Sequence, residues 1–338
     1  MIYPEFIKKR DIIGVTAPSD GLQKEMDFAR IELARANLGE VGFQTKITPN
    51  TYTSSSGRSS SVTDRVSQLM DLVTDDEVKW VIFATGGDFL VEILPYLDFD
   101  KIGSCPKWYQ GYSDNTGLLF LLTTLCDMAS VYGNHYNSFA ISPWHDSQKY
   151  NLACLTGNPI KQNSFDFYES EYHEKTDAKE GYHKDKQVCW DVVGEPNKRV
   201  TCQGRLLGGC MEVLLNIIGT KYDRVTEFCH RYKEDGVLWY LESYNLDTPS
   251  ITRGLLQMQE AGWFEQANGF VFGRPFISEY VYGIDYKEAV CTILEKYNKP
   301  LLFDVDIGHK QPSFTVINGA IGKFEYENKR GSLEMFFQ

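Results

Sequence analysis

Residues 107–127 read Lys-Trp-Tyr-Gln-Gly-Tyr-Ser-Asp-Asn-Thr-Gly-Leu-Leu-Phe-Leu-Leu-Thr-Thr-Leu-Cys-Asp and are the most informative feature of the chain. A short apolar run reaches Gly111, turns over residues 112–114 and enters an apolar helix near Thr116. A serine on a tight strand-to-helix turn has its hydroxyl pushed outward, beside N–H groups that can receive an oxyanion. Ser113 is therefore a candidate nucleophile, and the alternative is an ordinary N-cap or turn serine, which is more common.

Strands and helices alternate before this stretch. Apolar runs predict strands at residues 11–16, 43–47 and 78–84, and helical spacing predicts helices at 22–38, 62–73 and 89–97. The alternation predicts a doubly wound parallel α/β sheet, in which ligands bind beyond the carboxyl ends of the strands. Gly86 and Gly87 follow one such strand end, and Ser113 follows another. The serine-rich residues 53–61 indicate a loop.

The length of 338 residues indicates two domains. Residues 161–200 are charged and lack periodicity, which predicts a linker or excursion between an N-terminal domain (1–160) and a C-terminal domain (201–338). In the second half, predicted strands lie at 236–241, 269–272 and 301–305, with predicted helices at 211–218, 251–261 and 286–297. The sequence pattern of residues 313–338 predicts short antiparallel strands. We therefore expect a second α/β domain.

Composition argues against several classes of main partner. The chain is 42% hydrophobic and 24% charged with a net charge of −12, which argues against nucleic acid or an anionic membrane surface as the main partner. No secretory signal or membrane-spanning apolar stretch is visible, so a cytoplasmic protein is expected. The eight cysteines form no Cys-x-x-Cys pair, and there is no P-loop. We expect no metal and no organic cofactor.

An acid and a base follow in the second half. Glu242 comes after five apolar residues, a costly place for a carboxylate unless it is paired or functional, and the alternative is a strand end that reaches solvent. His309 follows Gly308 after another predicted strand, although most loop histidines carry no chemistry. Together Ser113, Glu242 and His309 stand in one of the orders in which a catalytic triad occurs.

The roles in such a triad are simple. His309 would take the proton from Ser113, and Glu242 would hold the imidazole in the required tautomer. The N–H groups of Gly87 and Asp114 would form the oxyanion hole. Outside this set, Trp190 is either a hydrophobic anchor or a ring that stacks on a ligand.

These motifs give the chain a resemblance to the LD-carboxypeptidase family of serine peptidases over nearly its whole length. The matching elements are Ala17-Pro18-Ser19, Asp64-Arg65, Gly86-Gly87, Gly111-Tyr-Ser-Asp114, Gly204-Arg-Leu-Leu-Gly-Gly209, Leu241-Glu242 and Gly308-His309. The resemblance implies a flavodoxin-like N-terminal domain and a smaller α/β C-terminal domain. It also implies the Ser113–Glu242–His309 triad, oxyanion donors at Gly87 and Asp114, and a homodimer.

Within the family, Gly86-Gly87 followed by Leu-Pro-Tyr-Leu-Asp at 94–98 resembles the microcin C self-immunity branch. That branch cleaves an amide that links an acidic amino acid to a modified nucleotide, and Trp190 is then a candidate for stacking on the base. The alternatives are a murein carboxypeptidase, which removes a terminal D-amino acid from a cell-wall tetrapeptide, and a binding module without catalysis. Cys210 stands where asparagine is common, and residues 243–247 lack an expected lysine. These departures bear on the substrate and leave the triad intact.

Overall fold

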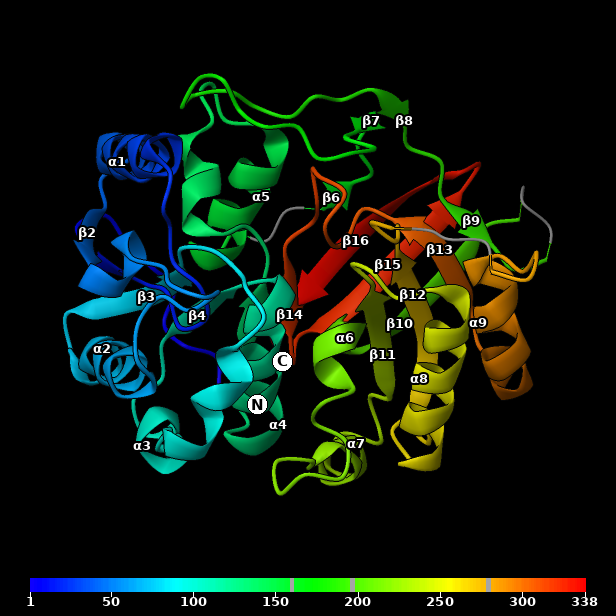
Figure 1. The fold of residues 1–338 in the computed structure, drawn as a ribbon. Coiled ribbons are helices and arrows are strands. Elements are labelled where there is room, and N and C mark those ends of the chain that lie inside the picture. Colours follow the sequence, from blue (N-terminus) through cyan, green and yellow to red (C-terminus); the bar gives the residue numbers. More distant parts are fainter. Residues whose placement is uncertain (159–160, 195–197, 278–280) are drawn as a thin grey trace. The chain divides into compact units, whose positions relative to one another are not determined.

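The structure, a computed structural model, describes residues 1–158, 161–194, 198–277 and 281–338 (Figure 1). It divides into two compact units. Unit 1 comprises Met1–Pro159, His173–Gly181 and Thr315–Ile317, and unit 2 comprises Ile160–Tyr172, Tyr182–Phe314 and Asn318–Gln338. Ser113 therefore belongs to unit 1, whereas Glu242 and His309 belong to unit 2.

Unit 1 is built on a six-stranded sheet in the order β14-β5-β4-β3-β1-β2. Its strands are β1 (Ile12–Thr16), β2 (Gln44–Ile47), β3 (Val78–Phe83), β4 (Trp108–Gly111), β5 (Ser130–Tyr132) and β14 (Val316–Asn318). Strands β1 to β5 pair in parallel, which confirms the predicted doubly wound sheet. β3 is buried except at Lys79, as a central parallel strand covered on both faces should be.

Helices cover both faces of this sheet. They are α1 (Glu25–Glu40), α2 (Val62–Thr74), α3 (Phe99–Gly103), α4 (Thr116–Leu125) and α5 (Asp146–Leu155). α1 and α5 lie on one side of the sheet, and α2, α3 and α4 lie on the other (Figure 1). The helix predicted at 89–97 is instead two 3-10 turns, η2 (Leu90–Glu92) and η3 (Leu94–Tyr96). Pro95 lacks the N–H that would continue a helix there.

Unit 2 is built on an eight-stranded sheet in the order β6-β16-β15-β10-β11-β12-β13-β9. The four central strands pair in parallel: β10 (Val200–Cys210), β11 (Val237–Glu242), β12 (Ala267–Gly273) and β13 (Leu301–Val305). Antiparallel strands flank them: β15 (Ile321–Glu327), β16 (Arg330–Phe336), β6 (Gln162–Asn163) and β9 (Asp191–Val192). The helices are α6 (Met211–Leu214), α7 (Val225–Arg231), α8 (Thr248–Glu260) and α9 (Tyr286–Leu294). α8 and α9 pack side by side (Figure 1).

The predicted excursion contributes to both units. Residues 173–181 belong to unit 1, where Arg30 Nη1 donates a 2.8 Å hydrogen bond to Ala178 O. Most of the rest belongs to unit 2, with the short hairpin of β7 (Phe167–Tyr168) and β8 (Lys186–Gln187) and the edge strands β6 and β9. Short strands of this kind pair only at edges, so their sequences carry little periodicity.

Candidate active site

Ser113 lies at the carboxyl end of β4, on the turn that leads into α4. Its φ of +61° is in the left-handed region, which residues other than glycine rarely occupy. Gly111 allows the turn to be this tight, because a Cβ there would lie 2.8 Å from the Phe83 ring and 3.0 Å from Asn115 Cβ. The predicted strand–turn–helix is therefore present, with the backbone conformation typical of a nucleophile elbow.

The Gly86–Gly87 pair borders Ser113 within unit 1. A Cβ at Gly86 would lie 3.0 Å from Ser113 Cβ and 3.1 Å from Ser113 Oγ, so only glycine leaves the hydroxyl room. Gly87 has a φ of +151°, and a Cβ there would lie 2.8 Å from Asp20 N. The N–H groups of Gly87 and Asp114 donate no hydrogen bond to a described residue of this unit. Both groups are therefore available to a ligand from within unit 1.

The Asp114 side chain ties the serine turn to the glycine loop, a role that the sequence did not reveal. Its Oδ2 accepts hydrogen bonds from Ser19 Oγ and, at 2.8 Å, from Leu90 N. Burial raises the pKa of Asp114, and these two hydrogen bonds only partly oppose that effect. Asp114 thus holds Ser19 and the first residue of η2 against the turn that leads into α4.

Asn115 and His135 brace the same turn. Asn115 Nδ2 donates to Thr85 O at 2.9 Å and to Tyr112 O at 3.2 Å, and lies 3.0 Å from His135 Nε2. The His135 ring stacks on Tyr112 with a centroid distance of 4.2 Å. The only signal for His135 in the sequence is its place just after an apolar run. These contacts give it a supporting role next to Ser113.

Glu242 and His309 contact each other in unit 2. Glu242 ends β11 and is 1% exposed, and its Oε2 lies 2.8 Å from His309 Nδ1. Burial lowers the pKa of His309, but the charge of Glu242, the hydrogen bond to it and the charge of Glu212 outweigh burial and raise that pKa above 6.5. The buried carboxylate therefore has a partner, and the imidazole is held at Nδ1.

Trp190 lies elsewhere in unit 2. Its side chain is fully buried, its ring packs against Phe314 and Phe324, and its Nε1 donates a 2.9 Å hydrogen bond to Asp306 Oδ2. Asp306 is also buried and pairs with Arg274 at 2.7 Å. These contacts support the anchor interpretation of Trp190 over a ring that is open to a ligand.

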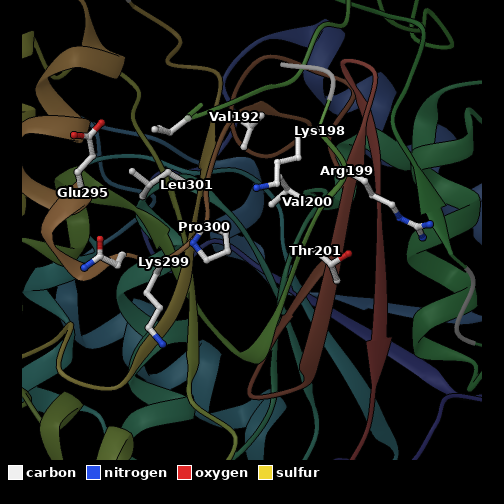
Figure 2. Close-up of a pocket in the computed structure, with 11 residues that line it drawn as sticks. Val192, Lys198, Arg199, Val200, Thr201, Glu295, Lys299, Pro300 and Leu301 are labelled. Carbon is white, nitrogen blue, oxygen red and sulfur yellow. The ribbon is translucent and has the colours of Figure 1, made fainter. Parts of the chain in front are cut away.

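Described residues of unit 2 also line a groove, but its charged side chains do not converge. A groove of about 700 Å³ is lined by residues of 192–201 and 295–301 (Figure 2). Its cations do not converge: Lys198, Arg199 and Lys299 point in different directions (Figure 2), and Arg199 pairs with Glu325 at 3.2 Å. Within the described ranges, no three His, Cys, Asp or Glu side chains are grouped to hold a metal ion. In the same residues, no helix is long and apolar enough to cross a membrane.

Comparison with known sequences places both halves of the chain in one family. The profile described as LD-carboxypeptidase N-terminal domain matches residues 13–133, and that of the LD-carboxypeptidase C-terminal domain matches residues 203–323. The chain is 25% identical over 341 residues to a Bacillus subtilis (strain 168) protein named "Probable murein peptide carboxypeptidase". The match covers 98% of this chain and 94% of that protein. It is 23% identical over 293 residues to the Escherichia coli "Microcin C7 self-immunity protein MccF". That match covers 82% of this chain and 79% of MccF.

Solved structures agree on the fold. The crystal structure of an MccF-like protein from Bacillus anthracis str. Ames matches with a TM-score of 0.82 and 24% identity, covering 100% of both chains. MccF in complex with aspartyl sulfamoyl adenosine matches with a TM-score of 0.79 and 19% identity, covering 99% of this chain and 98% of that one. Because one profile spans Ser113, the other spans Glu242 and His309, and together they span most of the sequence, the chain belongs to the LD-carboxypeptidase family of peptidases.

Proposed function

We propose that the chain is a serine-type peptidase or amidase in which Ser113 is the nucleophile, His309 the general base and Glu242 the residue that orients the base. The observation that carries the proposal is the buried hydrogen bond of 2.8 Å between His309 Nδ1 and Glu242 Oε2. A carboxylate at Nδ1 fixes the tautomer and leaves Nε2 to accept a proton. The left-handed Ser113 at a strand-to-helix turn supports the choice of nucleophile.

In the proposed reaction, Ser113 Oγ attacks the carbonyl carbon of a peptide-like amide, and its proton passes to His309 Nε2. The Gly87 and Asp114 N–H groups would stabilise the oxyanion. The imidazolium then gives the proton to the departing nitrogen as the C–N bond breaks. A water molecule deprotonated by His309 attacks the resulting ester, which releases the acid and restores Ser113. The proposal uses no metal and no organic cofactor.

For the substrate we favour an aminoacyl-nucleotide amide, as in microcin C self-immunity. The motif at residues 86–98 supports this choice, and so does the relative MccF, which has been solved with aspartyl sulfamoyl adenosine bound. A murein tetrapeptide is the second candidate, because a relative of similar identity is named for murein peptides. The expected homodimer and cytoplasmic location remain predictions, which light scattering and cell fractionation would test.

The test is a mass-spectrometric cleavage screen that compares a cell-wall tetrapeptide with an aspartyl or glutamyl nucleotide amide. Ser113→Ala should lower kcat/KM for the cleaved substrate by roughly 10⁴–10⁶, because members of a triad act as a unit. Ser104→Ala, which changes an exposed serine of the same unit, is the matched control. Wild-type protein should also be labelled at Ser113 by a fluorophosphonate.

Two outcomes would count against the proposal. Full activity in Ser113→Ala would remove the assigned nucleophile. Binding of these compounds by the wild-type protein without any turnover would favour the non-catalytic binding module.

A further inference from the structure

The turn that follows Glu242 is fixed by a single carboxylate oxygen. Glu212 lies on α6, and its Oε1 accepts a hydrogen bond from Ser243 Oγ at 3.0 Å. The same oxygen accepts from three consecutive N–H groups, those of Tyr244 (2.8 Å), Asn245 (2.8 Å) and Leu246 (3.2 Å). Hydrogen bonds to a charged acceptor are stronger than neutral ones, so the backbone of this turn has one well-defined conformation.

Cys210 occupies the other oxygen of Glu212. Its thiol donates to Glu212 Oε2 at 3.1 Å. Burial raises the pKa of the Cys210 thiol, and the neighbouring Glu242 and Glu212 carboxylates raise it further. The thiol therefore stays protonated and remains a donor. Both oxygens of Glu212 are engaged in holding local structure, so the carboxylate cannot swing toward a ligand without releasing the turn.

The segment at Phe276 and Ile277 also forms hydrogen bonds with this turn. Phe276 N donates to Ser243 O at 2.9 Å, and Ile277 N donates to Tyr244 O at 2.9 Å. These bonds set the two rings against each other: Tyr244 and Phe276 stack with centroids 5.0 Å apart and an angle of 12° between their planes. The pair is therefore a rigid, nearly parallel stack whose position is set by backbone hydrogen bonds rather than by the rings alone.

This stack lies beside the proposed base. The Tyr244 ring is 4.8 Å from the His309 ring, and the Phe276 ring is 6.3 Å from it. Tyr244 is nevertheless 43% exposed, whereas His309 has only 10% of its side chain exposed. A group that reaches His309 therefore comes close to the exposed part of Tyr244. Exposed aromatic surface that is held rigid loses little entropy when it binds a ligand.

We propose that the Tyr244–Phe276 pair is a subsite for a planar ring of the substrate, supplied either by an aromatic amino-acid side chain or by a nucleobase. The inference rests on the proposed function, since it uses His309 to locate the scissile bond. It extends that function by naming a group that the substrate carries and a surface that receives it. Neither Tyr244 nor Phe276 is part of the proposed triad.

The charges around the pair favour a neutral ring over an anionic group. The Glu242 carboxylate lies 2.8 Å from His309 Nδ1 and the Glu212 carboxylate lies 2.8 Å from Tyr244 N, so two acidic groups lie close to the pair. An acidic group placed there would meet like charge, whereas the polar edge of a neutral aromatic ring tolerates it. Offset stacking on an exposed tyrosine contributes affinity that corresponds to about tenfold in an equilibrium constant.

The experiment uses pairs of amide substrates that differ only in the ring. One pair carries a phenylalanyl or a cyclohexylalanyl residue on the same leaving amine, and the other carries adenosine or ribose on the same acyl group. Wild-type protein should prefer the planar member of at least one pair by about tenfold in kcat/KM. Tyr244→Ala should abolish this preference, and Tyr244→Phe should keep it. Tyr96→Ala, which removes an exposed tyrosine of unit 1, should keep it as well.

The ratio of kcat/KM between the two substrates of a pair distinguishes a ring that binds the substrate from a ring that only positions His309. If Tyr244 only orients His309, then Tyr244→Ala lowers kcat/KM for both substrates of a pair by the same factor. That result overturns the inference. Calorimetric binding to Ser113→Ala and to Ser113→Ala/Tyr244→Ala gives a readout that needs no turnover, so failure of the proposed chemistry would leave this test intact. Equal binding of planar and non-planar members in both pairs would overturn the inference.

Discussion

Gly308 is packed against Glu242 so closely that no larger residue fits. A Cβ at residue 308 would lie 2.7 Å from Glu242 Oε2 and 2.9 Å from its Cβ, and the φ of Gly308 is +101°. Glycine is therefore required at this position for two reasons: the backbone has a positive φ, and there is no space for a side chain. The carboxylate oxygen that Gly308 borders is the one that holds His309.

Gly308→Ala should consequently disturb the Glu242–His309 pair although neither of these two residues is replaced. A displacement of about 1 Å in a catalytic group costs roughly 10² in rate, so kcat/KM should fall at least that far. The strained backbone should also lower the free energy of unfolding by about 1–3 kcal/mol. Urea denaturation and steady-state kinetics measure the two effects.

Gly39→Ala is the matched control, because a Cβ at Gly39 meets no atom within 4 Å and its φ is not in the left-handed region. That variant should retain full activity. A Gly308→Ala protein with normal kcat/KM would mean that the Glu242–His309 geometry is not needed for the reaction.

Replacing Glu242 by glutamine should move the pH dependence of the reaction. The base must be neutral, so kcat/KM falls as the pH drops below the pKa of His309. Burial lowers that pKa, but Glu242 and Glu212 raise it above its ordinary value, and the acidic limb of the wild-type profile should therefore lie at higher pH than for a free imidazole. In Glu242→Gln the charge is lost and burial remains, so the limb should shift to lower pH while kcat falls by about 10³–10⁴.

A pH profile of kcat/KM for both proteins checks this expectation. Glu227→Gln, on α7, is a control that removes one carboxylate from the surface of the same unit. An acidic limb that stays in place in Glu242→Gln would show that the titrating group is not His309.

Asp114 should act through its side chain as well as its backbone. Asp114→Ala removes the acceptor for Leu90 N and Ser19 Oγ, which frees the loop that carries Gly87. We expect kcat to fall by roughly 10²–10³, as when an oxyanion donor is lost, with a smaller change in KM. Asp114→Asn keeps an acceptor oxygen and should recover most of the activity. Equal kcat in the alanine and asparagine variants would contradict a positioning role.

The sequence predicted the features of this protein that follow from burial. Apolar runs such as Val78–Phe83, interrupted only by Lys79, are typical of parallel strands because both faces of such strands are covered. Glu242 was a candidate because a carboxylate at the end of a buried strand needs a partner unless it reaches solvent, and in the structure it is buried 2.8 Å from His309 Nδ1.

Other features depend on contacts between segments that are distant in the sequence, and the local sequence pattern does not predict them. β10 was not predicted, because glycines at 204, 208 and 209 weaken its strand signal, although Gly208 is required where the chain meets Tyr240. Glu212 looks like any polar residue at a helix start, and its role appears only when the turn after Glu242 folds back onto it. Asp114 was chosen for its N–H, yet its carboxylate also accepts hydrogen bonds from Ser19 and Leu90, which lie far from it in the sequence.

Trp190→Phe should separate the two interpretations of this tryptophan. Phenylalanine keeps part of the ring packing against Phe314 and Phe324 but removes the hydrogen bond to Asp306. Losing a donor to a buried carboxylate should lower the free energy of unfolding by about 1–3 kcal/mol. Because the ring is fully buried, KM for a nucleotide amide should not change. Trp144→Phe, which loses a bond to a backbone carbonyl in unit 1, controls for the loss of an indole N–H. A rise in KM without loss of stability would instead identify Trp190 as a ring that contacts the substrate.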